Sequence, residues 1–333
     1  MFAEAAEAPA IVAGQLKSNA PLIAELAASL RARPPRAIVT IARGSSDNAA
    51  TYARYLLETR LGVLTASAAP SVSSVYGMMP DMANTLVLML SQSGRSPDLL
   101  AAAKAAKRNG ARVVALVNDE TSPLAMLAEI AIPLSAGPER SVAATKSFIA
   151  SLSAVAQLVA EWSEDDHLRE SLTKLPEMLD KAWMLDWSAT LPLLESADHL
   201  YVVSRGLGLA IAQEAALKFK ETCGLHAEAF STAEVRHGPM ALVNADFPVL
   251  AFLPTDETRA GVEDTIKTLR AHDATVMVVG GDGQNSLAMV QGDPCLEPIA
   301  QAQALYRLVN ALAALRGHNP DAPPHLAKVT ETL

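Results

Sequence analysis

A gapless internal repeat constrains the fold of this chain more than any other feature of its sequence. When the 333-residue chain is aligned with itself at an offset of 162 residues, Arg43-Gly44 falls on Arg205-Gly206. The same offset lays Leu86 on Pro248, in TLVLML against FPVLAF, and Val113 on Thr275, in ARVVALV against ATVMVVG. Three strand ends in register under one offset indicate two copies of one structural unit.

Each copy alternates short β-branched segments, such as AIVTIA at 37–42, with longer stretches rich in Ala and Leu. This alternation is typical of parallel sheets covered by helices. We therefore predict an α/β fold with two related domains. The predicted organisation is an N-terminal helical arm (1–30), a first domain (31–163), a helical linker (164–195), a second domain (196–316) and a C-terminal tail (317–333).

The amino-acid composition limits which binding partners and which cellular location we expect. Half of the residues are apolar, so the chain can bury two sizeable cores. The net charge of −9 argues against a nucleic acid or an anionic membrane as partner, although a small anionic substrate stays possible. Cys223 and Cys295 lie far apart and suggest reduced core thiols. Because no signal-type segment or long apolar run is present, we expect a soluble cytoplasmic protein that does not bind a membrane.

The segment SQSGRSP at 91–97 follows one strand-like run and precedes a helix-like one. A purely structural explanation exists, because strand-to-helix turns favour Ser and Gly, and Pro is common at the first helical position. The alternative is an anion cradle at the helix N-terminus. Its side-chain donors would be Ser91, Gln92, Ser93 and Ser96.

The second copy favours the cradle over the structural explanation. There the same turn reads LPTDETR (253–259), with two acids and no glycine. A turn that the fold itself required would not be free to change in this way. In the first copy, Gly44, Ser45 and Ser46 form another small polar turn after the neighbouring strand. Since ligands bind at the carboxyl ends of strands in open parallel sheets, we predict a phosphate pocket there.

Three charged residues, Glu214, Lys218 and Glu221, follow the Arg205-Gly206 turn at i, i+4 and i+7 spacing. Such spacing is most often a solvated, salt-bridged helix face. Here the helix should be flanked by sheet, where charges are costly unless they are paired or used. A functional role is therefore favoured.

Longer segments extend this picture, because they resemble the sugar isomerase (SIS) domains of glutamine–fructose-6-phosphate aminotransferase. They are GSS at 44–46, SQSGRSPD at 91–98, AGPERSVAATKSF at 136–148, the very specific block at 214–243, and HLAKVTETL at 325–333. The resemblance covers nearly the whole chain. It implies two flavodoxin-like three-layer domains, a sugar 6-phosphate bound in the first, and catalytic groups from the second domain and the tail.

The resemblance also implies individual roles. The positions that match phosphate and sugar contacts are Gly44, Ser46, Ser91, Gln92, Ser93 and Ser96, with Ser45 where the family usually has Thr. Glu221 matches the base that moves a proton between C1 and C2 of the sugar, and Lys218 its neighbour. His237 matches a ring-opening histidine donated by the other subunit, which implies a homodimer with shared active sites. Lys328 matches a lysine that can form a Schiff base. From the residues alone, His237 could equally be a helix-cap histidine and Lys328 a solvated tail lysine.

Three departures from the aminotransferase shape the functional expectation. Ala144 stands where that enzyme has a Ser that touches the sugar, and Arg95 stands where it has Glu. The chain begins Met-Phe, without the glutaminase domain whose nucleophile is an N-terminal Cys. With SQSGRSPD in a chain that lacks this domain, it resembles the SIS-type glucosamine-6-phosphate deaminases, which form fructose 6-phosphate and ammonia. Ring opening, proton transfer and imine hydrolysis need a histidine, a carboxylate and a lysine. The alternatives are an isomerising aminotransferase-type enzyme and a non-catalytic sugar-phosphate sensor.

Two shorter motifs point to other classes of protein. The segment SRGLGLAI resembles a dinucleotide fingerprint, but Ile211 stands in place of its third glycine, so an oxidoreductase is a weak alternative. His226-Ala-Glu228 resembles part of a zinc deaminase motif, but Pro294-Cys295 lacks the second cysteine of the P-C-x-x-C partner. We therefore expect neither a cofactor nor a metal.

Overall fold

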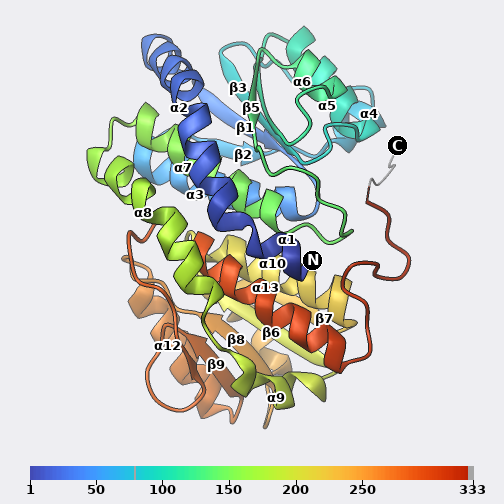
Figure 1. Cartoon of the computed structure of the whole chain (residues 1–333), viewed down its shortest axis with the longest axis vertical. Coiled ribbons are helices and arrows are strands. Elements are labelled where there is room, and N and C mark those ends of the chain that lie inside the picture. The colour runs from blue at the N-terminus through green and yellow to red at the C-terminus, as the bar shows by residue number, and fades with distance from the viewer. Residues whose placement is uncertain (79, 329–333) are drawn as a thin grey trace. The chain divides into compact units, whose positions relative to one another are not determined.

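The computed structural model describes residues 1–78 and 80–328 and divides into two compact units (Figure 1). The first-sheet unit comprises residues 10–139, 146–174 and the described part of 326–333. The second-sheet unit comprises residues 1–9, 140–145 and 175–325. The domain limits expected from the sequence stay predictions, and residues 329–333 of the expected catalytic tail lie outside the described residues.

The first-sheet unit contains a five-stranded sheet in the order β2-β1-β3-β4-β5, in which every pair of neighbours is parallel. Its strands are β1 (Ala37–Ile41), β2 (Thr65–Ser67), β3 (Thr85–Ser91), β4 (Arg112–Val117) and β5 (Ile130–Pro133). Its helices are α2 (Ala8–Ala32), α3 (Ser45–Leu61), α4 (Ser71–Ser74), α5 (Pro97–Arg108), α6 (Pro123–Leu127) and α7 (Lys146–Trp162), and α8 (Asp166–Trp183) leads out of the unit. The order reverses direction between β1 and β3, which makes the crevice between them the expected ligand position.

The second-sheet unit repeats this topology in the order β10-β9-β8-β6-β7, again with parallel neighbours. Its strands are β6 (His199–Ser204), β7 (His226–Ser231), β8 (Pro248–Phe252), β9 (Thr275–Val279) and β10 (Ser286–Leu287). Its α-helices are α1 (Phe2–Ala6), α9 (Leu191–Glu195), α10 (Gly208–Cys223), α11 (Thr232–Val235), α12 (Arg259–Ala271) and α13 (Glu297–Leu315), with short 3-10 turns at Ser188–Thr190 and Pro239–Leu242.

The repeat predicted from the sequence is confirmed strand by strand. β6 begins 162 residues after β1, and β8 and β9 each begin 163 residues after β3 and β4. The predicted fold class, two α/β domains with parallel sheets, is confirmed as well. The pairing register locates the difference: Val39 lies opposite Val87 and Tyr201 opposite Val249, at the same spacing. Val87 lies opposite Val113 and Val249 opposite Val276, so the connection from β8 to β9 is one residue longer than that from β3 to β4.

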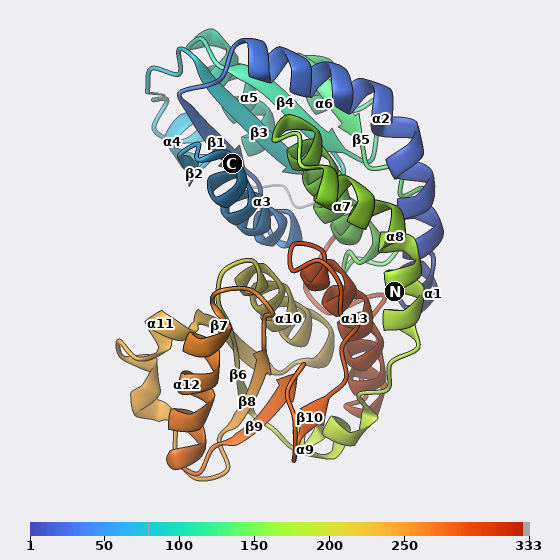
Figure 2. The same cartoon turned by 90° about the vertical axis from the view of Figure 1, so that its left-hand side faces the viewer.

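Helices cover both faces of each sheet, which explains the continuous apolar strands (Figure 2). All seven residues of β3 are buried, as expected for a central strand with no face open to solvent. Alternate strand residues such as Val87 and Met89 pack with Leu99 of α5 in one core. In the second-sheet unit, Val249 of β8 packs with Ile266 of α12 in the equivalent core. The other faces lie against α3 and α7 in the first-sheet unit and against α10 and α13 in the second (Figure 2).

Candidate active site

Two polar turns meet at the carboxyl edge of the first sheet. β1 and β3 are hydrogen-bonded neighbours with Ile41 opposite Met89, so the turns that follow them leave the same edge. Gly44 is the N-cap residue of α3 and has a φ of 55°, a conformation that L side chains rarely adopt. This turn places Ser45 and Ser46, both partly buried, in the first turn of α3. The N–H of Ser46 donates to the carbonyl of Arg43 at 3.1 Å.

The turn after β3 is held by its own side chains. The buried Ser91 hydroxyl accepts a hydrogen bond from the N–H of Gly94 at 3.1 Å, and Ser93 accepts one from the N–H of Arg95 at 3.3 Å. Gly94 has a φ of 62°, and a Cβ there would lie 2.2 Å from Oγ of Ser122. Ser91 and Gly94 therefore have a structural role in the turn, whatever the turn binds.

The turn after β3 leads directly into the N-terminus of α5. Ser96 is the N-cap residue, and Pro97 occupies the first turn. The Ser96 side chain makes no capping hydrogen bond, although Ser is a strong capping residue. Pro97 has no N–H, and the N–H groups of Leu99 and Leu100 already donate to Oδ1 of Asp98 at 2.8 Å and to the carbonyl of Ser96 at 3.0 Å. An anion at this position would therefore accept hydrogen bonds mainly from the serine hydroxyls, with support from the helix dipole.

Two arginines flank the turns, and each is paired with an aspartate. Nε and Nη2 of Arg43 both lie 2.9 Å from Oδ2 of the buried Asp98. Arg95 lies 2.7 Å from Asp119, whose pKa is lowered by hydrogen bonds from Thr121 and then from Arg95. Arg95 thus makes an exposed ion pair beside the β3 turn.

Asn118, which the sequence analysis missed, joins three segments at this edge. Its backbone N–H donates to the carbonyl of Gln92 at 3.1 Å, and its side-chain amide donates to the carbonyl of Gly137 at 2.8 Å. Its side-chain oxygen accepts from the N–H of Ala136 at 2.8 Å. The rule that ligand sites lie at the carboxyl ends of parallel strands could have identified this residue, because Asn118 directly follows β4.

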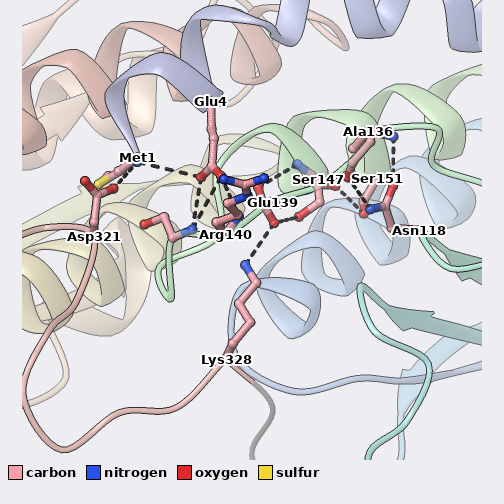
Figure 3. Close-up of polar contacts among 12 residues, drawn as sticks. Met1, Glu4, Asn118, Ala136, Glu139, Arg140, Ser147, Ser151, Asp321 and Lys328 are labelled. Carbon is pink, nitrogen blue, oxygen red and sulfur yellow. Dashed lines mark hydrogen bonds and ion pairs between the residues drawn. The ribbon is translucent and has the colours of Figure 1, made fainter.

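Glu139 is the second residue that the sequence analysis missed. Its buried carboxylate accepts hydrogen bonds from the backbone and the hydroxyl of Ser147, and Nζ of Lys328 lies 3.3 Å from its Oε2 atom (Figure 3). The predicted Schiff-base lysine is thus paired with a buried acid. Although Glu139 lies inside the quoted AGPERSVAATKSF segment, no local pattern indicated its partner.

In the second-sheet unit, α10 carries the predicted charged cluster. Nζ of Lys218 lies 2.7 Å from Oε2 of Glu221 and 3.5 Å from Oε1 of Glu214. The hydroxyl of Tyr306 on α13 donates to Glu214 at 3.0 Å. The side chains of Lys218 and Glu214 are 1% and 0% exposed, so the solvated-face interpretation of this spacing is wrong. Only Glu221, at 22% exposure, reaches solvent.

The remaining predicted residues lie in loops of the second-sheet unit. His237 is exposed and follows α11, and its N–H donates to the carbonyl of Glu234. Ala144 is partly buried in the segment 140–145, where the N–H of Val142 donates to the carbonyl of Asp321. The structure therefore divides the predicted groups: the serine turns and Lys328 belong to the first-sheet unit, whereas Ala144, Lys218, Glu221 and His237 belong to the second.

The β6/β8 crevice, equivalent in the repeat to the serine crevice, is lined by acids. Glu297 accepts from the hydroxyl of Thr255 at 2.7 Å and from the N–H of Gly292 at 3.1 Å, and burial raises its pKa. Asp256 accepts from the N–H of Thr258 at 2.8 Å. Carboxylates in these positions oppose an anion, in agreement with the asymmetry seen in the sequence.

No helix in residues 1–78 or 80–328 is long and apolar enough to cross a bilayer.

Comparison with known proteins agrees with this architecture. The SIS domain model matches residues 33–161 and 193–314. Glutamine–fructose-6-phosphate aminotransferase of Thermotoga maritima is 31% identical over 266 residues, covering 73% of this chain and 43% of that protein. The enzyme of the same name from Pyrococcus horikoshii is 30% identical over 346 residues, covering 98% of this chain and 57% of that protein. The chain thus spans about half the length of these relatives.

Solved structures extend the similarity over almost the whole chain. A provisionally assigned phosphosugar isomerase from Silicibacter pomeroyi is 43% identical, with a TM-score of 0.92, and covers 96% of this chain and 99% of that one. The C-terminal domain of glucosamine-fructose-6-phosphate aminotransferase from Francisella tularensis is 25% identical, with a TM-score of 0.86 and coverage of 96% and 97%. Glucosamine-6-phosphate deaminase from Thermotoga maritima shares the fold, with 23% identity, a TM-score of 0.74 and coverage of 97% and 100%. With two matched copies of the domain, this chain belongs to the SIS domain family.

Proposed function

We propose that the chain is an isomerising glucosamine-6-phosphate deaminase, which converts glucosamine 6-phosphate and water into fructose 6-phosphate and ammonia. Membership of the SIS family and the similarity to sugar-phosphate enzymes support a sugar phosphate as substrate. The deaminating direction requires only the groups described above and water. The enzymatic class, the substrate and the direction are all part of this proposal.

The serine turns would bind the 6-phosphate. Ser46, Ser93 and Ser96 offer hydroxyl donors beside the N-termini of α3 and α5. Hydrogen bonds from several neutral donors and a helix dipole bind a phosphate without a dedicated cationic side chain. This arrangement suits a chain whose nearby arginines are already engaged with aspartates.

Glu221 would carry the proton. After His237 opens the sugar ring, the Glu221 carboxylate removes the proton from C2 of the amino aldehyde and returns it to C1. The oxygen on C1 takes up a proton as the electron pair of the broken C–H bond forms the enolamine. When C1 is then protonated the amino group gives up a proton, which leaves an imine at C2 and a hydroxyl on C1. Water adds to this imine and ammonia leaves, which yields the ketose. Lys328 would provide the faster route for this last step, in which its neutral amine adds to C2, expels ammonia and is released by water.

The observation that carries the proposal is the burial of Lys218 between two carboxylates, of which only Glu221 reaches solvent. A buried ammonium is costly unless it is paired, and the pair with Glu221 holds that carboxylate in one orientation at the accessible end of the cluster. An ordinary surface salt bridge would leave its lysine in solvent, whereas Lys218 is buried. The geometry suits a base that must meet a substrate proton in a defined position.

A second candidate is an aminotransferase-type enzyme that makes glucosamine 6-phosphate, and the names of the relatives favour it. The two functions share the isomerisation and differ in the source or fate of nitrogen. The test is to incubate the purified chain with glucosamine 6-phosphate, its galacto epimer and its N-acetyl form, and to measure ammonia and ketose phosphate separately. We expect equal amounts of both products from glucosamine 6-phosphate, without any effect of glutamine. Glutamine-dependent synthesis from fructose 6-phosphate would establish the second candidate, and binding without turnover would indicate a sensor.

A further inference from the structure

A buried carboxylate is anchored at the start of α7. The Glu139 side chain is fully buried, its Oε1 atom accepts from the N–H of Ser147 at 3.2 Å, and its Oε2 atom accepts from the Ser147 hydroxyl at 2.6 Å. Ser147 lies in the first turn of this 17-residue helix, where the dipole favours a negative charge. Glu139 is therefore held in one orientation by the helix itself.

The same carboxylate receives the C-terminal segment. Nζ of Lys328 lies 3.3 Å from Oε2 of Glu139, and the Lys328 side chain extends from the tail toward the acid (Figure 3). The lysine side chain is 26% exposed, so it closes the solvent side of a buried acid. The two residues are 189 positions apart in the chain, which makes this contact a link between the tail and the first sheet.

The loop that carries Glu139 is fixed to the edge of the sheet that holds the serine turns. Asn118 bonds to Ala136 and Gly137 in this loop and to Gln92 at the end of β3. A rigid loop places the carboxylate, and hence the amine paired with it, at a defined point of that edge.

We propose that Glu139 is a positioning residue that holds the amino group of Lys328 at the carboxyl edge of the first sheet. This inference rests on the proposed function for the catalytic role of Lys328. The contact itself can be tested without substrate. Glu139 makes no chemical step in this proposal, because it acts only through the lysine that it orients.

The first test measures the reactivity of Lys328 in the whole chain without substrate. Each variant is treated with limiting acetic anhydride, and acetylation of individual lysines is quantified by peptide mass spectrometry. We expect Glu139→Gln to increase labelling of Lys328 severalfold relative to the exposed Lys174 in the same sample. Glu297→Gln is the matched control, because Glu297 is also a buried acid that accepts from a hydroxyl and a backbone N–H. Equal labelling of Lys328 in the wild type and in Glu139→Gln would overturn the proposal.

The second test measures turnover of glucosamine 6-phosphate. Glu139→Gln should lower kcat by roughly 10- to 100-fold, with little change in KM, because a misplaced group loses rate rather than substrate affinity. Glu139→Asp should recover part of both readouts, and it replaces Glu139→Gln if that variant does not fold. Increased labelling with an unchanged kcat would overturn the positioning role. A wild-type chain without turnover would count against the proposed function, and the labelling result would still decide whether Glu139 holds Lys328.

Discussion

Nζ of Lys218 lies 2.7 Å from Oε2 of Glu221, at the one point where the buried charges of α10 reach solvent. On its other side the same ammonium lies 3.5 Å from Glu214, which is fully buried. Lys218 therefore balances two carboxylates in different surroundings. Its removal should affect stability as well as activity, whereas a change at Glu221 should affect activity alone.

We expect Lys218→Met to lower the free energy of unfolding by about 3–5 kcal/mol, because it leaves the carboxylate of Glu214 buried without its cation. Glu221→Gln should instead lower kcat by roughly 10²–10⁴-fold and leave stability nearly unchanged. Denaturant titration and the ammonia assay separate the two effects. Lys174→Met, at an exposed pair with Glu170, is the control and should change neither quantity. A stable Lys218→Met protein would contradict this account.

The serine turns predict different effects for neighbouring hydroxyls. Ser93→Ala should raise KM for the sugar phosphate, since a hydrogen bond to a charged group contributes roughly 1.5–3 kcal/mol. Ser91→Ala should raise KM and also lower the melting temperature, because the buried Ser91 hydroxyl bonds to Gly94. Steady-state kinetics and thermal unfolding are the measurements, with the exposed Ser196→Ala as control. If Ser93→Ala lowered stability but left KM unchanged, the turn would be structural only.

Gly94 permits a separate test of the turn. Gly94→Ala should destabilise the chain and weaken binding of the sugar phosphate, because its Cβ would lie 2.2 Å from Oγ of Ser122 in addition to the strain of a positive φ. Gly62→Ala is matched in φ, at 65°, but meets no atom within 4 Å. Gly62→Ala should lower stability only by the cost of an alanine at positive φ, and it should leave KM unchanged. Equal loss of stability in both variants would show that the collision is relieved by movement of Ser122.

The buried thiols predict a dependence on pH. Burial raises the pKa of Cys223 from 9.0 to about 11. The unfolded thiol loses its proton first, so the free energy of unfolding should fall between pH 9 and 11, by at most about 1.4 kcal/mol per pH unit. Cys223→Ser should reduce this slope.

In the native protein at neutral pH, a thiol reagent should react slowly with Cys223 and Cys295, which are both buried, and rapidly after denaturation. Rapid reaction of the native protein would contradict their burial.

Mixing experiments test the prediction that His237 acts in the neighbouring subunit. Glu221→Gln and His237→Ala chains should each be nearly inactive, with a loss of roughly 10²–10⁴-fold. In a hybrid dimer one site would collect both changes, and the other would combine the intact Glu221 of one chain with the intact His237 of its partner. With random exchange of subunits, two-fold symmetry predicts recovery to about a quarter of wild-type activity. If conditions that exchange subunits give no recovery, His237 acts within its own chain or is structural, and the shared-site model fails.

Local patterns in the sequence determined the strands, the helices and the repeat. AIVTIA and TLVLML are apolar and partly β-branched, and their alignment at one offset predicts two copies of a parallel sheet without any knowledge of tertiary contacts. The strand-end rule also predicts that Gly44 and Ser91 approach the same edge, since neighbouring parallel strands end together. These inferences succeed because periodicity and strand direction are properties of short segments.

Only the tertiary structure decided which charges are buried and paired. The i, i+4, i+7 spacing of Glu214, Lys218 and Glu221 is the same on a solvated helix and a covered one, and the packing of α13, with Tyr306 on Glu214, made it a buried cluster. The pairing of Glu139 with Lys328 joins segments 189 residues apart, and no local period encodes such a distance. The energy of a charge depends on its surroundings after folding, so its role becomes visible only when the chain has brought those surroundings together.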